Sequence, residues 1–213
     1  MTRSTNKLIA EMAEELQPVR SLRLRDGVLL AVGALALTLV AVELVVGFWR
    51  GVWAGEASTF FILTNGLLLI LGCASASTVL RMASPRVGNH HEGPRWASLG
   101  VAVLPVAALL VLLGHDHPAE ALGAVYGFKC FGATMLTSSL TAVALFLWLR
   151  RGAPVSPAMA GLHLGVASTA LGSVAFGFAC PLDSTIHLGI WHVLPVLLGA
   201  VAGRFIVAPL LRW

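Results

Sequence analysis

The chain has 213 residues, of which 57% are hydrophobic and only 11% are charged. A soluble globular domain has about a quarter charged residues, so this composition excludes an ordinary soluble fold and indicates a protein that faces lipid. The net charge of +4 could suit a nucleic-acid binder, but the basic residues flank apolar runs, which is typical of membrane topology instead.

The first 26 residues form a polar segment that carries no cleavable signal peptide, because the apolar run after them is too long for the core of one. Four apolar residues recur here at helical spacing: Leu8, Ile9, Met12 and Leu16. A cap is available at residues 4–6, and Pro18 ends the run. The pattern predicts a short amphipathic helix that remains in the cytoplasm.

The polar face of this helix is acidic, with Glu11, Glu14 and Glu15 against the single Lys7. Helices that lie on membranes usually have basic polar faces, because bilayer surfaces are anionic. An acidic amphipathic helix is better suited to a groove on a basic protein partner. The alternative is a solvated leader that merely positions the first span.

Six apolar runs are long enough to cross a bilayer, which takes about 20 residues. They cover residues 27–48, 57–80, 96–114, 131–149, 158–179 and 186–207. The third contains Pro105. The runs predict an all-α polytopic membrane bundle over residues 27–213.

The basic residues predict the orientation of this bundle. Twelve of the fourteen Lys and Arg residues lie in the N-terminal segment, the second and fourth loops and the C-terminal end. The first, third and fifth loops hold only Arg50 and Lys129. By the positive-inside rule, both termini are therefore cytoplasmic.

Small residues recur in the spans, including a GxxxG pattern at Gly161 and Gly165. In lipid such residues let helix backbones approach closely, and we expect packing within the bundle rather than a dimer face. Glu43 is the one carboxylate within a span. A proton relay needs partners, so ion transport is weakly supported.

The predicted outer face collects the residues that could carry chemistry: His115, Asp116, His117, Cys130, Cys180, Asp183 and His187. Proline favours the first turn of a helix, so Cys180-Pro181 predicts that Cys180 lies at or near the N-cap of the sixth span. Cys180, Asp183 and His187 would then share one helical face.

Two hypotheses follow for Cys130 and Cys180. They form a reversible thiol–disulfide pair in an oxidising compartment, or they bind a soft metal ion such as zinc or cadmium with His115, His117, Asp183 or His187. A permanent structural disulfide and two inert thiols are the alternatives. Cys73 is expected to be a packing residue, and His192 to be hydrogen-bonded within the bundle.

Three stretches of the chain resemble the NrsF-type anti-sigma factors. They are the N-terminal Leu8-Ile9 to Leu22 segment, the loop at residues 150–157, and Cys180-Pro181-x-Asp183-Ser184 followed by Trp191; the C-terminal Leu-Leu-Arg-Trp is similar too. The resemblance implies a six-span regulator of the bacterial inner membrane and not an enzyme.

The resemblance also implies a partner and a signal. The N-terminal segment would hold an extracytoplasmic-function sigma factor, without direct contact to nucleic acid, and release it under heavy-metal or oxidant stress. The family's paired cysteines map onto Cys130 and Cys180, while His192 stands where many members have tyrosine. No permanent cofactor is expected, and zinc or another soft metal ion would bind transiently.

Two other functions compete with this interpretation. A membrane thiol oxidoreductase could use Cys130 and Cys180 and pass electrons to a quinone, but such enzymes usually have a CxxC pair, which the chain lacks. A transporter of small ions or metals would need more polar residues in the spans than the sequence provides.

Overall fold

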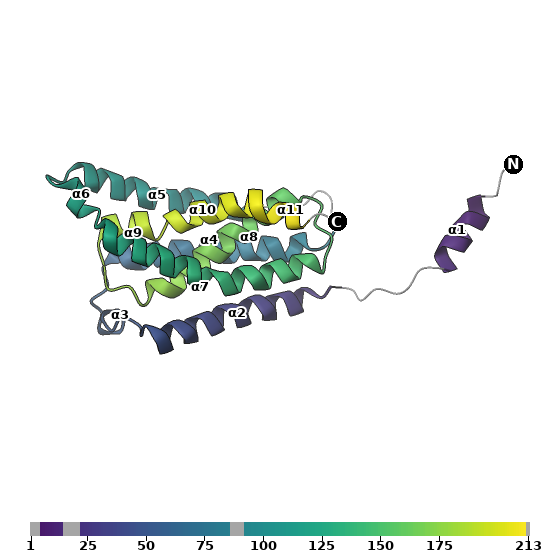
Figure 1. The fold of residues 1–213 in the computed structure, drawn as a ribbon, viewed down its shortest axis with the longest axis horizontal. Helices are drawn as coiled ribbons and strands as arrows, with labels where there is room; N and C mark the ends of the chain where they lie inside the picture. The colour runs from purple at the N-terminus through teal and green to yellow at the C-terminus, as the bar shows by residue number, and fades with distance from the viewer. Residues whose placement is uncertain (1–4, 15–21, 86–91, 212–213) are drawn as a thin grey trace.

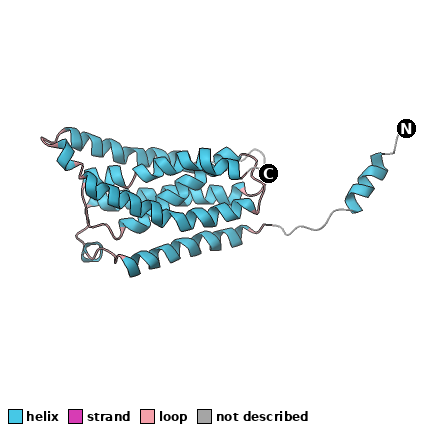
Figure 2. Cartoon of the chain, in the orientation of Figure 1, coloured by secondary structure: helices cyan, strands magenta, loops and turns pink. Residues whose placement is uncertain are grey.

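The computed structural model describes residues 5–14, 22–85 and 92–211, and this part of the chain is helical without a strand (Figures 1 and 2). Its elements in chain order are α1 (Thr5–Glu14), α2 (Leu24–Val45), α3 (Gly51–Ala54), α4 (Thr59–Met82), α5 (Gly93–Leu113), α6 (Pro118–Ala121), α7 (Ala124–Arg150), α8 (Pro157–Gly177), α9 (Thr185–Trp191), α10 (Leu194–Ala202), a π-helical turn (Gly203–Val207) and α11 (Ala208–Leu210). The predicted all-α class is confirmed.

Six helical stretches of the described chain are long and apolar enough to cross a membrane, in agreement with the six predicted runs. They are α2, α4, α5, α6 with α7, α8, and α9 through α11. The start of α2 and the end of α11 lie at the same end of the bundle (Figure 1). The helix α5 continues through Pro105, so the proline does not end the third span.

Serine caps define where several spans begin. The hydroxyl oxygen of Ser58 accepts a hydrogen bond from the Phe61 N–H at 3.0 Å and caps α4. Ser156 caps α8, where Pro157 occupies the first turn, and Ser184 caps α9. A side-chain acceptor at the N-cap satisfies one of the donors that a helix end leaves free, which matters more at a membrane boundary where water is scarce.

The helix α8 is the centre of the bundle. Most of its residues are buried, whereas less than half of each other span is buried. It packs against α4, α7 and α10 along its length. Its sequence is rich in Gly, Ala, Ser and Thr, and these small side chains let three neighbours approach the same helix closely.

The contact between α8 and the last span is made by backbone. A Cβ atom at Gly165 would overlap the carbonyl oxygen of Gly199, and one at Gly161 would overlap the carbonyl oxygen of Gly203. The GxxxG pattern of the fifth span therefore faces a second GxxxG, at Gly199 and Gly203, within the same chain. As expected, it serves packing within the bundle.

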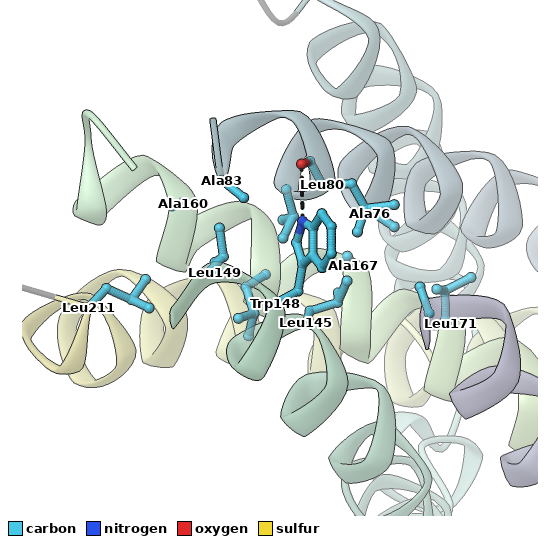
Figure 3. Packing of buried hydrophobic residues seen from close by; sticks show 13 residues of the cluster. Ala76, Leu80, Ala83, Leu145, Trp148, Leu149, Ala160, Ala167, Leu171 and Leu211 are labelled. Carbon is cyan, nitrogen blue, oxygen red and sulfur yellow. Dashed lines mark hydrogen bonds between the residues drawn. The ribbon is translucent and has the colours of Figure 1, made fainter. Parts of the chain in front are cut away.

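A second close contact joins the beginning of the first span to the fourth (Figure 3 shows the surrounding cluster). The indole N–H of Trp148 donates to the carbonyl oxygen of Leu80 at 3.1 Å, and the ring is buried among Leu145, Leu149 and Ala167. A Cβ at Gly27, near the start of α2, would lie 2.6 Å from this ring. Trp148 on α7 thus fixes the base of α2.

The last span is not one continuous helix. Pro195 has no N–H for the carbonyl of Trp191 and its ring disfavours a regular turn there, so α9 ends at Trp191 and α10 begins at Leu194. The carbonyl oxygen of His192, at the break, accepts a hydrogen bond from the Ser173 hydroxyl at 2.7 Å. This bond ties the break to α8.

We predict that Gly165→Ala destabilises the bundle by about 1–3 kcal/mol, because an added methyl group in a tight contact forces backbone shifts. The matched control is Gly132→Ala on α7, where a Cβ meets nothing within 4 Å. Unfolding in detergent micelles measures both. Equal stabilities of the two variants would contradict the close packing of α8 on α10.

Candidate functional site

Cys130 lies inside α7 and not at the beginning of a helix. The helix begins earlier than expected, at Ala124, after Gly123 adopts a left-handed φ of 56°. The sequence analysis placed Lys129 in a loop, but Lys129 lies within α7. Its ammonium group lies over the ring of Tyr126, 5.6 Å from the centroid. A long basic side chain can reach the membrane interface from within a helix, so the charge does not end the span.

Cys180 lies in the connection between α8 and α9, so the expectation that it caps the sixth span is wrong. Ser184 is the N-cap of α9, and its hydroxyl accepts from the His187 N–H at 3.1 Å. Pro181 and Leu182 lie in the non-helical connection before this cap. Because residues 180–184 are not helical, Cys180, Asp183 and His187 do not share a helical face.

Asp183 has a structural partner. Its carboxylate accepts hydrogen bonds from the backbone N–H and the hydroxyl group of Ser58, both at 2.6 Å. These bonds join the α8–α9 connection to the beginning of α4. The carboxylate is engaged by Ser58, and Asp183 is not a member of the thiol cluster.

Four side chains of the described residues converge at this end of the bundle: Cys130, Cys180, His187 and His192. The two Sγ atoms are 3.6 Å apart, and Cys180 Sγ lies 3.5 Å from His187 Nε2. One candidate ligand atom from each of the four lies within 4.8 Å of the others. All four side chains are buried, His192 completely.

Trp191 aligns the two sides of this cluster. Its indole N–H donates to the carbonyl oxygen of Leu122 at 2.9 Å, and its ring covers Gly127, where a Cβ would overlap it. Gly127 is one turn before Cys130 on α7, and Trp191 directly precedes His192. The contact therefore holds α7 and α9 at the spacing that brings the thiols to the imidazoles.

The surroundings of Cys180 favour its neutral thiol. The hydrogen bond with Cys130 raises the pKa of the Cys180 thiol, and burial raises it further, while the neighbouring imidazoles act in the opposite direction. Neither ring nitrogen of His192 makes a hydrogen bond to a described residue. A buried polar group without a partner costs about 1–3 kcal/mol, so this imidazole is available to a ligand.

Comparison with known proteins identifies the family. The family model described as "NrsF: Negative regulator of sigma F" matches residues 12–213. The chain belongs to the NrsF family. It is 29% identical over 151 residues to the anti-sigma-F factor NrsF of Caulobacter vibrioides, covering 68% of each chain. It is 27% identical over 155 residues to the probable anti-sigma-F factor NrsF of Azospira oryzae, covering 70% of each chain. No solved structure matches.

Membership of the NrsF family confirms the resemblance found in the sequence. These proteins are regulators without enzymatic activity, so the oxidoreductase alternative is not supported. The match begins at Met12, after most of α1.

The remaining predicted metal ligands lie apart from the cluster. His115 and His117 are exposed beside α6, and neither joins the four buried side chains. The sequence analysis missed His192, which it assigned to hydrogen bonding within the bundle. The available signal was Pro195, which predicts a helix break about three residues earlier, at His192, and so a side chain there that need not follow the helical face.

The predicted sigma-binding residues lie on α1, which Figure 1 draws apart from the bundle. Leu8, Ile9 and Met12 are exposed at 48%, 59% and 62%. Glu11 lies 4.0 Å from Lys7 in an exposed ion pair, and Glu14 is exposed at the end of the helix. Leu16 and Glu15 lie outside the described residues.

Proposed function

We propose that this NrsF-family protein is an inner-membrane anti-sigma factor with both termini in the cytoplasm. Its N-terminal segment sequesters an extracytoplasmic-function sigma factor, and redox or heavy-metal stress at Cys130 and Cys180 releases it. The family match and the names of the relatives support the class. The single observation that carries the signal is the pair of buried thiols 3.6 Å apart at one end of the bundle.

The exposed apolar face of α1 supports the contact with sigma. Three large apolar side chains in water cost free energy unless a partner covers them, and Leu8, Ile9 and Met12 have no cover within the described chain. The acidic residues beside them suit a basic groove. The end of the bundle from which α1 extends carries the basic loops, which the positive-inside rule places in the cytoplasm.

The thiols can respond to a peroxide by a net two-electron oxidation, in which one thiol becomes a sulfenic acid and the second condenses with it and releases water. Bringing Sγ atoms from 3.6 Å to the bond length of about 2.05 Å forms a disulfide and releases two protons and two electrons. A peroxide accepts these and is reduced to water or an alcohol. The new bond would draw the α8–α9 connection toward α7 and so change how the two pack.

The helix α7 offers a route from the thiols to the cytoplasmic end. Cys130 and Trp148 lie 18 residues apart on it, which is about 27 Å of helix. Trp191 covers Gly127 near one end, and Trp148 covers Gly27 near the other. A tilt or shift of α7 at the cysteines is thus transmitted to the base of α2, which leads into the N-terminal segment.

The required coupling is small. A signal moves an equilibrium only through its different affinity for two states, and a tenfold change in sigma affinity corresponds to about 1.4 kcal/mol. One altered packing contact at Gly27 and Trp148 is of this magnitude.

The first prediction concerns sigma capture. We expect Leu8→Glu, Ile9→Glu and Met12→Glu together to abolish co-purification with the sigma factor, because they place charges on the apolar face of α1. The control is Ala10→Glu, which lies on the opposite face by helical spacing. Undiminished capture by the triple variant would rule out α1 as the contact.

The second prediction concerns release. We expect Cys130→Ser and Cys180→Ser each to retain sigma binding. Peroxide or cadmium should release sigma from either variant at least tenfold less effectively than from the parent protein, since the thiol pair is no longer complete. Cys73→Ser, on α4 outside the pair, should behave as the parent protein. Binding of labelled sigma to the protein in nanodiscs measures both affinities; normal release from the double Cys130→Ser, Cys180→Ser variant would exclude the pair as the sensor.

The third prediction concerns coupling. Trp148→Leu removes the ring that contacts Gly27 and the hydrogen bond to Leu80. We expect sigma capture to persist while the release by oxidant falls about tenfold, with disulfide formation at Cys130 and Cys180 unchanged. The exposed Trp96→Leu is the matched control. A variant that still releases sigma fully on oxidation shows that the signal takes another route.

A further inference from the structure

We infer that Cys130, Cys180, His187 and His192 form one binding site for a thiophilic divalent cation of the zinc class, with two sulfur and two nitrogen ligands. The inference rests on the proposed function and deepens it, because it names the full ligand set through which a metal would reach the sensory thiols. Two of the four ligands, the histidines, are contributed by the last span.

Two of the six distances between the ligand atoms match the edges of a tetrahedral site. With Zn–S near 2.3 Å and Zn–N near 2.0–2.1 Å, a tetrahedron has edges of about 3.8 Å between two sulfur ligands and about 3.5 Å between sulfur and nitrogen. The observed Sγ–Sγ distance is 3.6 Å, and the Cys180 Sγ to His187 Nε2 distance is 3.5 Å. The four candidate atoms lie within 4.8 Å of one another, so the longer separations must shorten by about 1 Å for all four to coordinate one ion.

His192 supplies the independent observation. It is fully buried, and neither ring nitrogen has a hydrogen-bond partner among the described residues. Its position is held from two sides, since Ser173 donates to its backbone carbonyl and the ring of Phe176 stacks on it at 6.4 Å. Coordination of a cation satisfies the buried nitrogen and removes the cost of leaving it alone.

The ligand set also selects the class of cation. Thiolate and imidazole prefer Zn²⁺, Cd²⁺ or copper, whereas Mg²⁺ and Ca²⁺ need oxygen ligands. The nearest acid along the chain, Asp183, is engaged by Ser58. The site therefore offers hard cations nothing to bind.

Metal binding would connect three parts of the fold. Cys130 lies on α7, Cys180 on the α8–α9 connection, His187 on α9, and His192 at the break before α10. One ion bound by all four side chains would hold α7 against the last span. This is also where the ring of Trp191 covers Gly127. Metal and disulfide are then two different constraints on the same pair of thiols.

Titration of the purified full-length protein with Co²⁺ in detergent tests the inference. Tetrahedral Co²⁺ with thiolate ligands has intense ligand-field and charge-transfer absorption, and we expect one equivalent to bind and Zn²⁺ to displace it. His192→Phe, which keeps a ring on Phe176, and His192→Gln should each weaken binding at least tenfold and alter the tetrahedral spectrum. The matched control is the double variant His115→Ala, His117→Ala, which should bind as the parent protein does.

A measurement on the unaltered chain keeps the test independent of folding. Added Zn²⁺ should slow alkylation of Cys130 and Cys180 at least tenfold and leave Cys73 unaffected. Unprotected thiols, or Co²⁺ spectra that the His192 variants leave unchanged, would overturn the metal site. Sigma capture measured on the same samples separates the two outcomes, because a protein that binds sigma without binding Co²⁺ refutes only this inference.

Discussion

Backbone contact between α8 and the last span is the constraint on which the end of the bundle that carries the cysteines depends. In lipid the hydrophobic effect does not drive helices together, so the approach must come from van der Waals packing of small residues. Gly161 and Gly165 meet Gly203 and Gly199 without side chains between them. Since α8 leads into Cys180 and α10 follows His192, this contact sets the distance across which the thiol and the imidazole meet.

The helix α7 relates the two ends of the molecule. At one end it presents Cys130 to the cluster, and at the other it inserts Trp148 between α4 and the base of α2. Near each end of α7 a tryptophan ring packs against a glycine. These contacts are so close that the helix cannot shift without displacing the element it packs against. A change of packing at the cysteines therefore has a physical route to the segment that precedes α2, although the thiols lie far from it.

The cluster of Cys130, Cys180, His187 and His192 lowers the stability of the fold but leaves groups that a ligand or an oxidant can act upon. Four buried polar side chains at one end of the bundle, one of them without a hydrogen-bond partner, cost folding free energy that an apolar core would not. The surrounding contacts offset this cost: Asp183 with Ser58, Ser173 with His192, and Trp191 with Leu122. An unsatisfied site held in a rigid frame is what a ligand or an oxidant can act upon.

The sequence by itself determined the all-helical class and the number of apolar helices long enough to span a membrane. The length of an apolar run and the serines and prolines at helix ends act locally along the chain. The sequence also grouped Cys130, Cys180 and His187, whose candidate ligand atoms the structure brings within 4.8 Å of one another. Only the tertiary structure decided that Asp183 binds Ser58, the N-cap of α4, that His115 and His117 lie apart, and that His192 completes the cluster. These outcomes depend on which elements pack together and on the break before Pro195, and no periodicity within one segment contains that information.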